Sequence, residues 1–296
     1  MDQLQKAIFQ TLIYADIFDY PLAPRELYKF LITDEALSYS CFRKVLSRIN
    51  ANDKRINANE NFYFLKGREE IVKIRGERKK WSQEKLEIAF RVGKRFKLIP
   101  WVKMVGITGA LAMENSDEND DIDLIIVTAK KRLWLVRFFS VLLTELAGVR
   151  RRPQDKSASW RNKICLNMFL GEDHLAVPAK ERNLFIAHEV CQVRLVWDKE
   201  NTYERFLWEN RWVKDYLPNA VKMKSKVKSQ KSKVKSQNDL FNFLEKIIYK
   251  FQLAYMKPRR TIEKIEESRV LFHPRDCSGW VMREYKRRCG AMGIES

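Results

Sequence analysis

Residues 105–127 read Val-Gly-Ile-Thr-Gly-Ala-Leu-Ala-Met-Glu-Asn-Ser-Asp-Glu-Asn-Asp-Asp-Ile-Asp-Leu-Ile-Ile-Val, and this stretch decides the fold. A nearly continuous apolar run over 100–108 ends at a glycine, as expected of a strand that is covered on both faces. A short Ala/Leu-rich helix and an acidic loop follow, and 122–128 is the next predicted strand. This order of strand, turn, helix and strand predicts an α+β fold with a small mixed sheet flanked by helices.

Asp121 and Asp123 are two positions apart on the second predicted strand, so their side chains project from the same face. Two carboxylates held this close repel each other, and a divalent cation relieves that repulsion. Carboxylate and phosphate oxygens are the ligands that Mg²⁺ prefers. The pair therefore predicts a site for Mg²⁺ or Mn²⁺, fixed by the aliphatic run at 124–127.

Gly109 allows the chain to turn sharply at the end of the first strand. The backbone N–H groups of residues 109–111 then point towards an anion, which is where the triphosphate of a nucleotide is expected. The candidate nucleotide-binding residues are Thr108, Gly109, Ala110 and Ser116.

The turn and the acid pair together resemble the DNA polymerase β-type nucleotidyltransferase superfamily, whose pattern is a strand, Gly-Ser, about ten residues and Asp-x-Asp on the next strand. Here Gly109-Ala110, ten residues and Asp121-Ile-Asp123 keep that spacing, and the resemblance covers about residues 98–170. It implies that Asp121 and Asp123 are catalytic metal ligands, that Gly109 is the glycine of the phosphate turn, and that an NTP is the substrate.

Two positions depart from that pattern. Ala110 stands where the superfamily has serine, so the hydroxyl that contacts phosphate has to come from Thr108 or Ser116. The strand predicted over 163–170 carries no third carboxylate, and Cys165 and Asn167 lie on one of its faces. With Asn167 in the third position, general-base help to the acceptor hydroxyl is lost, and a slow enzyme or a nucleotide-binding relic is the alternative.

Residues 1–75 are expected to form a winged-helix-like module, because three helical patterns precede two short β-prone pieces around an Asn-rich turn. In a nucleic-acid-binding module of this kind, the third helix would carry Arg43, Lys44 and Arg48 into a groove. A packing or dimerisation module is the alternative, since a solvated helix face has a similar composition.

The rest of the chain divides by composition and periodicity. The predicted parts are a linking helix at 76–97, a nucleotidyltransferase-like core at 98–220, a Lys-rich linker at 221–238 and a helical C-terminal segment at 239–296. Within the core, helices are predicted over 133–146, 180–190 and 203–216 and a further strand over 193–197. The linker contains Lys-Ser-Lys-Val-Lys-Ser-Gln twice, at 224–230 and 231–237, which is too polar to bury a core.

The composition excludes wholesale disorder, since 45% of the residues are hydrophobic. A formal net charge of +19 favours a polyanionic partner. Five cysteines without a CxxC pair and three histidines without ligand spacing argue against a disulfide framework and a zinc site, and His188-Glu189 is expected to be a packed helix position. No apolar stretch approaches the ~20 residues of a membrane span, and no signal sequence is evident, so a cytoplasmic protein without membrane association is expected.

Taken together, these features predict a Mg²⁺-dependent nucleotidyltransferase that transfers a nucleoside monophosphate from an NTP to a hydroxyl of an unidentified acceptor, with a nucleic acid or a protein as the candidates. One alternative is a winged-helix nucleic-acid-binding protein with a catalytically decayed core. Another is a transferase that modifies a partner protein. The residues leave the nucleobase, the acceptor and the oligomeric state open.

Overall fold

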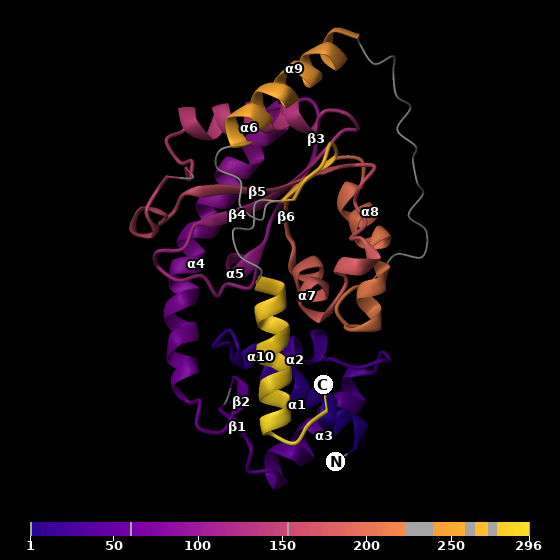
Figure 1. Ribbon diagram of the computed structural model, residues 1–296. Coiled ribbons are helices and arrows are strands. Elements are labelled where there is room, and N and C mark those ends of the chain that lie inside the picture. The colour runs from indigo at the N-terminus through magenta and orange to yellow at the C-terminus, as the bar shows by residue number, and fades with distance from the viewer. Residues whose placement is uncertain are drawn as a thin grey trace.

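The central sheet has six strands in the order β6-β3-β4-β5-β8-β7. It is seen in a computed structural model that describes residues 2–59, 61–152, 154–222, 239–257, 264–271 and 277–295 (Figure 1). The strands are β3 (Val102–Ile107), β4 (Ile122–Thr128), β5 (Ile164–Gly171), β6 (Arg194–Asp198), β7 (Lys264–Ile265) and β8 (Arg269–Leu271). β4 and β5 are parallel and the other neighbouring pairs are antiparallel, so the mixed sheet is confirmed.

Both faces of the sheet are covered, which explains the continuous apolar runs of β3 and β4. Alternate residues enter two different cores: Met104 and Ile125 pack on one side, and Val105 and Ile126 on the other. Asp123 has the same parity as Ile125, so its side chain belongs to the first side.

The second side is covered by three helices, α4 (Glu70–Arg95), α6 (Leu133–Leu146) and α9 (Asp239–Met256). The first side carries α7 (Leu184–Gln192), α8 (Thr202–Glu209) and the N-terminal module. α5 (Gly109–Ala112) follows β3 and contacts both α4 and α7. Short 3-10 helices lie at Phe96–Leu98, Ser157–Ser159, Ala179–Glu181 and Arg211–Asp215. The helix predicted over 180–190 therefore starts later, at Leu184, because the side chain of Asn183 caps it there.

The N-terminal module contains the three helices and the hairpin that the sequence predicts. They are α1 (Gln3–Asp16), α2 (Pro24–Lys29), α3 (Tyr39–Asn52), β1 (Ile56–Ala58) and β2 (Tyr63–Leu65). Leu22 forms an isolated antiparallel bridge with Tyr63, which ties the segment before α2 to the hairpin. The side chain of Ser38 accepts a hydrogen bond from the backbone N–H of Cys41 and so caps α3.

α4 begins earlier than the sequence indicates, since the predicted linking helix starts at residue 76 and the structure places its first residue at Glu70. The expected boundary at 75 therefore falls inside α4, which runs along both the module and the core (Figure 1). Arg75 binds the carboxylate of Glu26 at 2.8 Å and Arg78 donates to the carbonyl of Phe18, so the helix is fixed to the module through its arginines.

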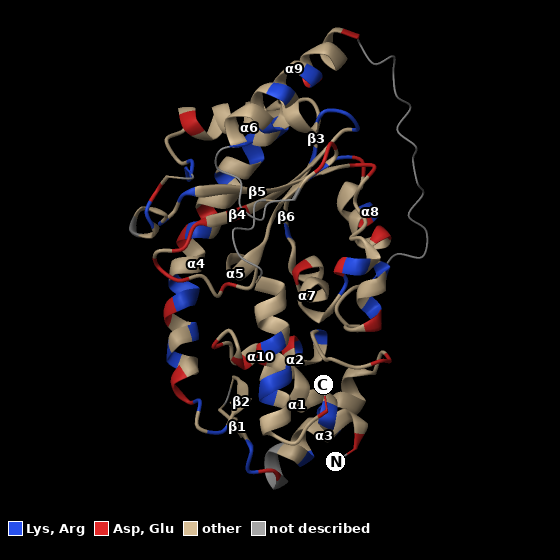
Figure 2. Ribbon diagram, viewed as in Figure 1, with Lys and Arg blue, Asp and Glu red and all other residues tan. Residues whose placement is uncertain are grey.

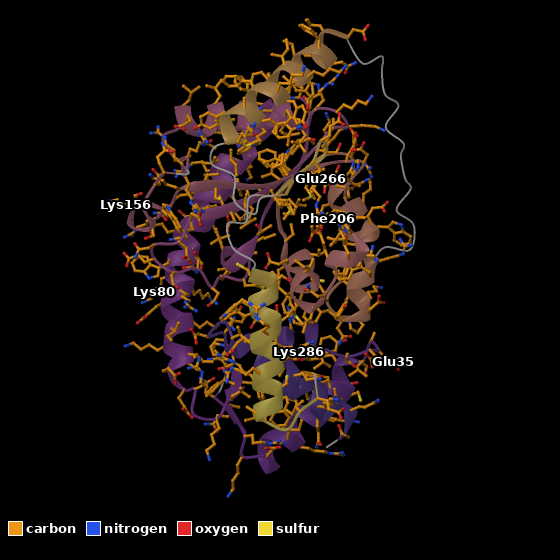
Figure 3. The ribbon with its side chains drawn as sticks, viewed as in Figure 1. Glu35, Lys80, Lys156, Phe206, Glu266 and Lys286 are labelled. Atoms are coloured by element: carbon orange, nitrogen blue, oxygen red, sulfur yellow. The ribbon has the colours of Figure 1, made fainter. Side chains whose placement is uncertain are left out.

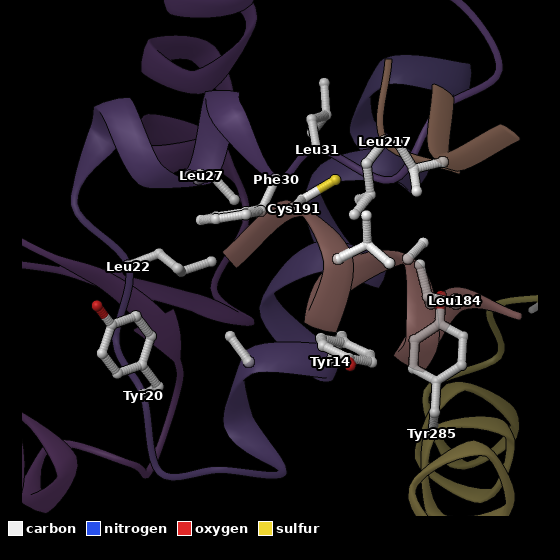
Figure 4. Packing of buried hydrophobic residues seen from close by; sticks show 14 of the residues in the cluster. Tyr14, Tyr20, Leu22, Leu27, Phe30, Leu31, Leu184, Cys191, Leu217 and Tyr285 are labelled. Carbon is white, nitrogen blue, oxygen red and sulfur yellow. The ribbon is translucent and has the colours of Figure 1, made fainter. Parts of the chain in front are cut away.

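The C-terminal segment differs from the prediction of a purely helical part. β8 adds to the core sheet beside β5, and β7 forms its edge; runs of two and three residues are too short to show a strand period in the sequence. α10 (Cys277–Ala291) then returns to pack on α1 and α7. Figure 4 shows Tyr285 of α10 near Tyr14 of α1. The predicted linker lies outside the described residues from residue 223 onwards.

α6 is only partly covered by its neighbours. Phe138, Phe139, Leu142 and Leu146 are exposed, and Leu146 retains 81% of its surface. The opposite side of the helix packs on β5 and α9. These contacts therefore cover only part of the apolar surface of α6.

Charge and hydropathy add little to the placement of a site. Lys and Arg occur along α4, α9 and α10 (Figure 2). All five cysteines lie in the described ranges, and none of them forms a disulfide there. Among the helices of the described ranges, none combines the length and the apolar character needed to cross a bilayer.

Candidate active site

The two predicted metal ligands lie at the start of β4, beside the end of β3. One ligand atom each from Asp121, Asp123 and Cys165 lie within 4.8 Å of one another. The backbone N–H of Thr108 donates to the carbonyl oxygen of Asp123 at 3.1 Å, which holds the turn against the strand. The expectation that the two aspartates share one face is confirmed.

Gly109 has a φ of +65°, a left-handed conformation that glycine adopts without cost. A Cβ atom on Gly109 would lie 3.3 Å from Oδ2 of Asp123, closer than ordinary van der Waals contact. The predicted sharp turn is therefore present, and it packs directly on one of the two carboxylates.

Gly109→Ala is expected to lower both stability and cation affinity, whereas Gly148→Ala should lower stability alone. Gly148 has a φ of +67°, like Gly109 in the left-handed region, but open space surrounds it. Alanine in this conformation costs about 1–2 kcal/mol, so both variants should be less stable than the wild type. Only the alanine at 109 would displace Asp123. Urea unfolding and Mn²⁺ titration of the two variants test this, and equal Mn²⁺ affinity in both would contradict the role of the turn.

Cys165 occupies the position on β5 that pairs in register with Asp123. Sγ of Cys165 lies within 4.8 Å of a carboxylate oxygen of Asp123. Nη1 of Arg151 lies 2.5 Å from Oδ2 of Asp121 and 3.5 Å from the Cys165 sulfur. The acid pair therefore has both a thiol and a guanidinium beside it, and β5 contributes no third carboxylate.

Arg151 is a site residue that the sequence did not reveal, because residues 150–152 are three arginines in a row. Its backbone N–H donates to the carbonyl of Ile164 at 2.9 Å, which places it beside the start of β5. Its guanidinium also lies 3.8 Å from the centre of the Trp160 ring. Only these contacts between distant segments distinguish Arg151 from its neighbours.

The electrostatics of the acid pair favour neutralisation. Burial raises the pKa of Asp123 well above its ordinary value, and the charge of Asp121 raises it further, while Cys165 and Arg151 lower it in part. Burial and the two carboxylates also raise the pKa of the Cys165 thiol, so the sulfur stays protonated at neutral pH. A divalent cation at this place would displace protons and relieve the repulsion.

The other predicted site residues separate into two groups. Thr108, Gly109 and Ala110 line the same cavity as Asp123. Ser116 does not, because its backbone N–H donates to Oγ of Ser82 and its hydroxyl lies 3.4 Å from a carboxylate oxygen of Asp120. Ser116 thus fixes the acidic loop against α4, and the phosphate contact proposed for it is not supported.

The cavity has a volume of about 800 Å³ and lies between the sheet, the N-terminal module, α7 and α10. Most of its wall is apolar, and it includes Phe206 of α8, which is labelled in Figure 3. Asn167 faces it from β5, and His188 and Glu189 line it from α7.

Glu189 was expected only to pack within its helix. Burial raises the pKa of its carboxyl to about 7, and within the described ranges no hydrogen bond or ion pair reaches that carboxyl. His188 does pack: its ring stacks on Tyr14 at 4.1 Å, and burial lowers its pKa to about 3. The signal for Glu189 was an acid inside a mostly apolar helix.

The donor set fits a hard divalent cation, since two carboxylates are adjacent and a nucleotide would supply further oxygens. The protonated thiol of Cys165 is a poor ligand for such an ion.

Comparisons with protein-family models, curated proteins and solved structures find no match to this chain.

Proposed function

We propose that this chain is a divalent-cation-dependent nucleotidyltransferase, which moves a nucleoside monophosphate from an NTP to a hydroxyl acceptor. The proposal rests on the positions of Asp121 and Asp123. Their carboxylate oxygens lie within 4.8 Å of each other, and Asp123 packs against the turn at Gly109. Along the chain the elements follow in the order β3, α5, β4, α6 and β5, and β4 is antiparallel to β3 and parallel to β5. This arrangement supports the proposal, because both acids lie at the start of β4, the middle strand of the three.

Asp121 and Asp123 would hold the cation, which supplies charge neutralisation to the triphosphate when bound. Gly109 leaves space beside Asp123 that a side chain would fill. The acceptor hydroxyl oxygen attacks the α-phosphorus, the bond to the oxygen bridging the β-phosphorus breaks, and pyrophosphate leaves while the hydroxyl proton passes to solvent.

Calorimetric titration of each NTP with Mn²⁺ tests the proposal. We expect at least one NTP to bind the wild type only with Mn²⁺, and Asp121→Asn to weaken that binding by about tenfold or more, a loss of ~1.4 kcal/mol. Asp117→Asn is the matched control, because Asp117 lies in the exposed acidic loop and pairs with Arg78. Failure of every NTP to bind the wild type with Mn²⁺ would refute the proposal.

A nucleic-acid-binding protein with a decayed core is the second candidate, and specific contacts favour it. Arg151 neutralises Asp121, and the neighbouring strand β5 contributes Cys165 and Asn167 but no carboxylate. The basic residues Arg43, Lys44 and Arg48 are exposed on α3. Salt-dependent binding of duplex DNA that survives Asp121→Ala with Asp123→Ala, together with no Mn²⁺-dependent NTP binding, would select this candidate.

A transferase that modifies a partner protein keeps the same site chemistry. Transfer of label from α-labelled ATP to protein and not to nucleic acid would identify it.

A further inference from the structure

Most of the charged residues that line the cavity beside Asp123 are acidic, although the chain as a whole is strongly basic. Its charged lining consists of Asp123, Glu181, Glu189 and Arg269. Arg269 is paired with Glu181 at 2.6 Å, so two carboxylates remain without a matching cation among the charged groups that line it. The cavity therefore favours a cationic group.

The size and the walls of the cavity suit a small organic molecule. About 800 Å³ lies within the range of small-molecule sites, roughly 300–1,000 Å³. Phe185 and Ile186 of α7 and Val281 of α10 contribute to an apolar wall that would cover the body of a ligand.

Two buried polar atoms in the cavity lack a hydrogen-bond partner within the described part of the chain. They are Oγ1 of Thr108, in a residue with 7% exposure, and Nε2 of His188, in a residue with 4% exposure. The side-chain amide of Gln192 lies 3.3 Å from Nδ1 of His188; an amide N–H donating there leaves the ring proton on Nε2. That proton needs an acceptor, such as the oxygen of a hydroxyl group.

We propose that this cavity binds a small organic amino alcohol, with its apolar body against α7 and α10 and its ammonium group at Glu189. The hydroxyl oxygen of the ligand accepts from His188 or Thr108. The further assignment of this ligand as the acceptor rests on the proposed nucleotidyltransferase function, and it replaces the nucleic-acid or protein acceptor with a small molecule.

A pair of fluorescent probes tests the binding in the absence of nucleotide. Dansylcadaverine carries an apolar ring system and a primary amine, and dansylglycine carries the same ring system and a carboxylate. We expect dansylcadaverine to bind one site per chain with a rise and blue shift of its emission, and dansylglycine to bind about tenfold more weakly or worse, which corresponds to ~1.4 kcal/mol. Equal affinity for the two probes, or no saturable binding of the amine, would overturn the proposal.

Two variants locate the probe in the cavity. Glu189→Gln keeps the shape of the side chain and should weaken dansylcadaverine binding about fivefold or more, whereas the exposed control Glu209→Gln should not. Ile186→Trp fills the cavity and should abolish binding, while Leu240→Trp, at a site with 59% exposure, should leave it unchanged. Binding that is unaffected by both cavity variants would contradict the location.

The same probe separates this inference from the transferase proposal. Asp121 does not line the cavity, so Asp121→Asn should keep dansylcadaverine binding within about twofold, because its charge is partly neutralised by Arg151. Probe binding without Mn²⁺-dependent NTP binding would leave the amine site standing and remove the transferase. The reverse result would leave the transferase standing and remove the amine as its acceptor.

Discussion

Asp123→Asn is expected to stabilise the folded chain at pH 8 while it removes binding of a divalent cation. Burial and the neighbouring Asp121 both disfavour the charged form of Asp123, so its folded pKa lies above the unfolded value. A carboxyl with a raised folded pKa costs stability once the pH exceeds its unfolded pKa, and neutral asparagine removes that cost. We expect a gain of about 1 kcal/mol or more in the free energy of unfolding.

The same substitution should lower any nucleotidyl transfer on the order of a thousandfold, or ~4 kcal/mol of barrier, because one metal ligand is lost. Thermal unfolding with and without Mn²⁺ gives the readout: the midpoint of the wild type should rise with Mn²⁺ and that of the variant should not. Asp117→Asn, in the exposed loop, should behave as the wild type. A variant that is destabilised at pH 8, or that still responds to Mn²⁺, would contradict the account of the acid pair.

Glu189→Gln is expected to stabilise the chain by up to about 3 kcal/mol at pH 8, from the pKa difference between about 4.5 and about 7. Below pH 4.5 the carboxyl is protonated in both the folded and the unfolded chain, so its burial carries no ionisation cost. Between the two pKa values only the unfolded chain ionises, and the wild type loses stability as the pH rises. Above pH 7 the difference between wild type and variant becomes constant.

Urea unfolding at pH 4, 6 and 8 measures that profile. The difference between wild type and Glu189→Gln should be close to zero at pH 4 and largest at pH 8. Glu209→Gln, which removes an exposed carboxylate from α8, provides the flat reference. A difference that does not change with pH would show that Glu189 is ionised without cost in the folded chain.

Local pattern predicted much of the architecture. β4 and α6 have the bounds that the sequence indicated, 122–128 and 133–146, because an apolar strand or helix shows its period within its own residues. The shared face of Asp121 and Asp123 follows from the same period of two along a strand. The turn at Gly109 was equally visible, since glycine is the residue that adopts a positive φ.

Tertiary structure decided the remaining features of the site. Pattern alone did not select Arg151 from three arginines and did not place Cys165 opposite Asp123. It also gave Ser116 a phosphate contact, whereas in the structure Ser116 fixes the acidic loop against α4. Pattern also missed β8 and the acidic cavity that Glu189 lines. Backbone geometry fixes which way a side chain points within its own element, whereas strand register and packing between distant segments fix which side chains meet.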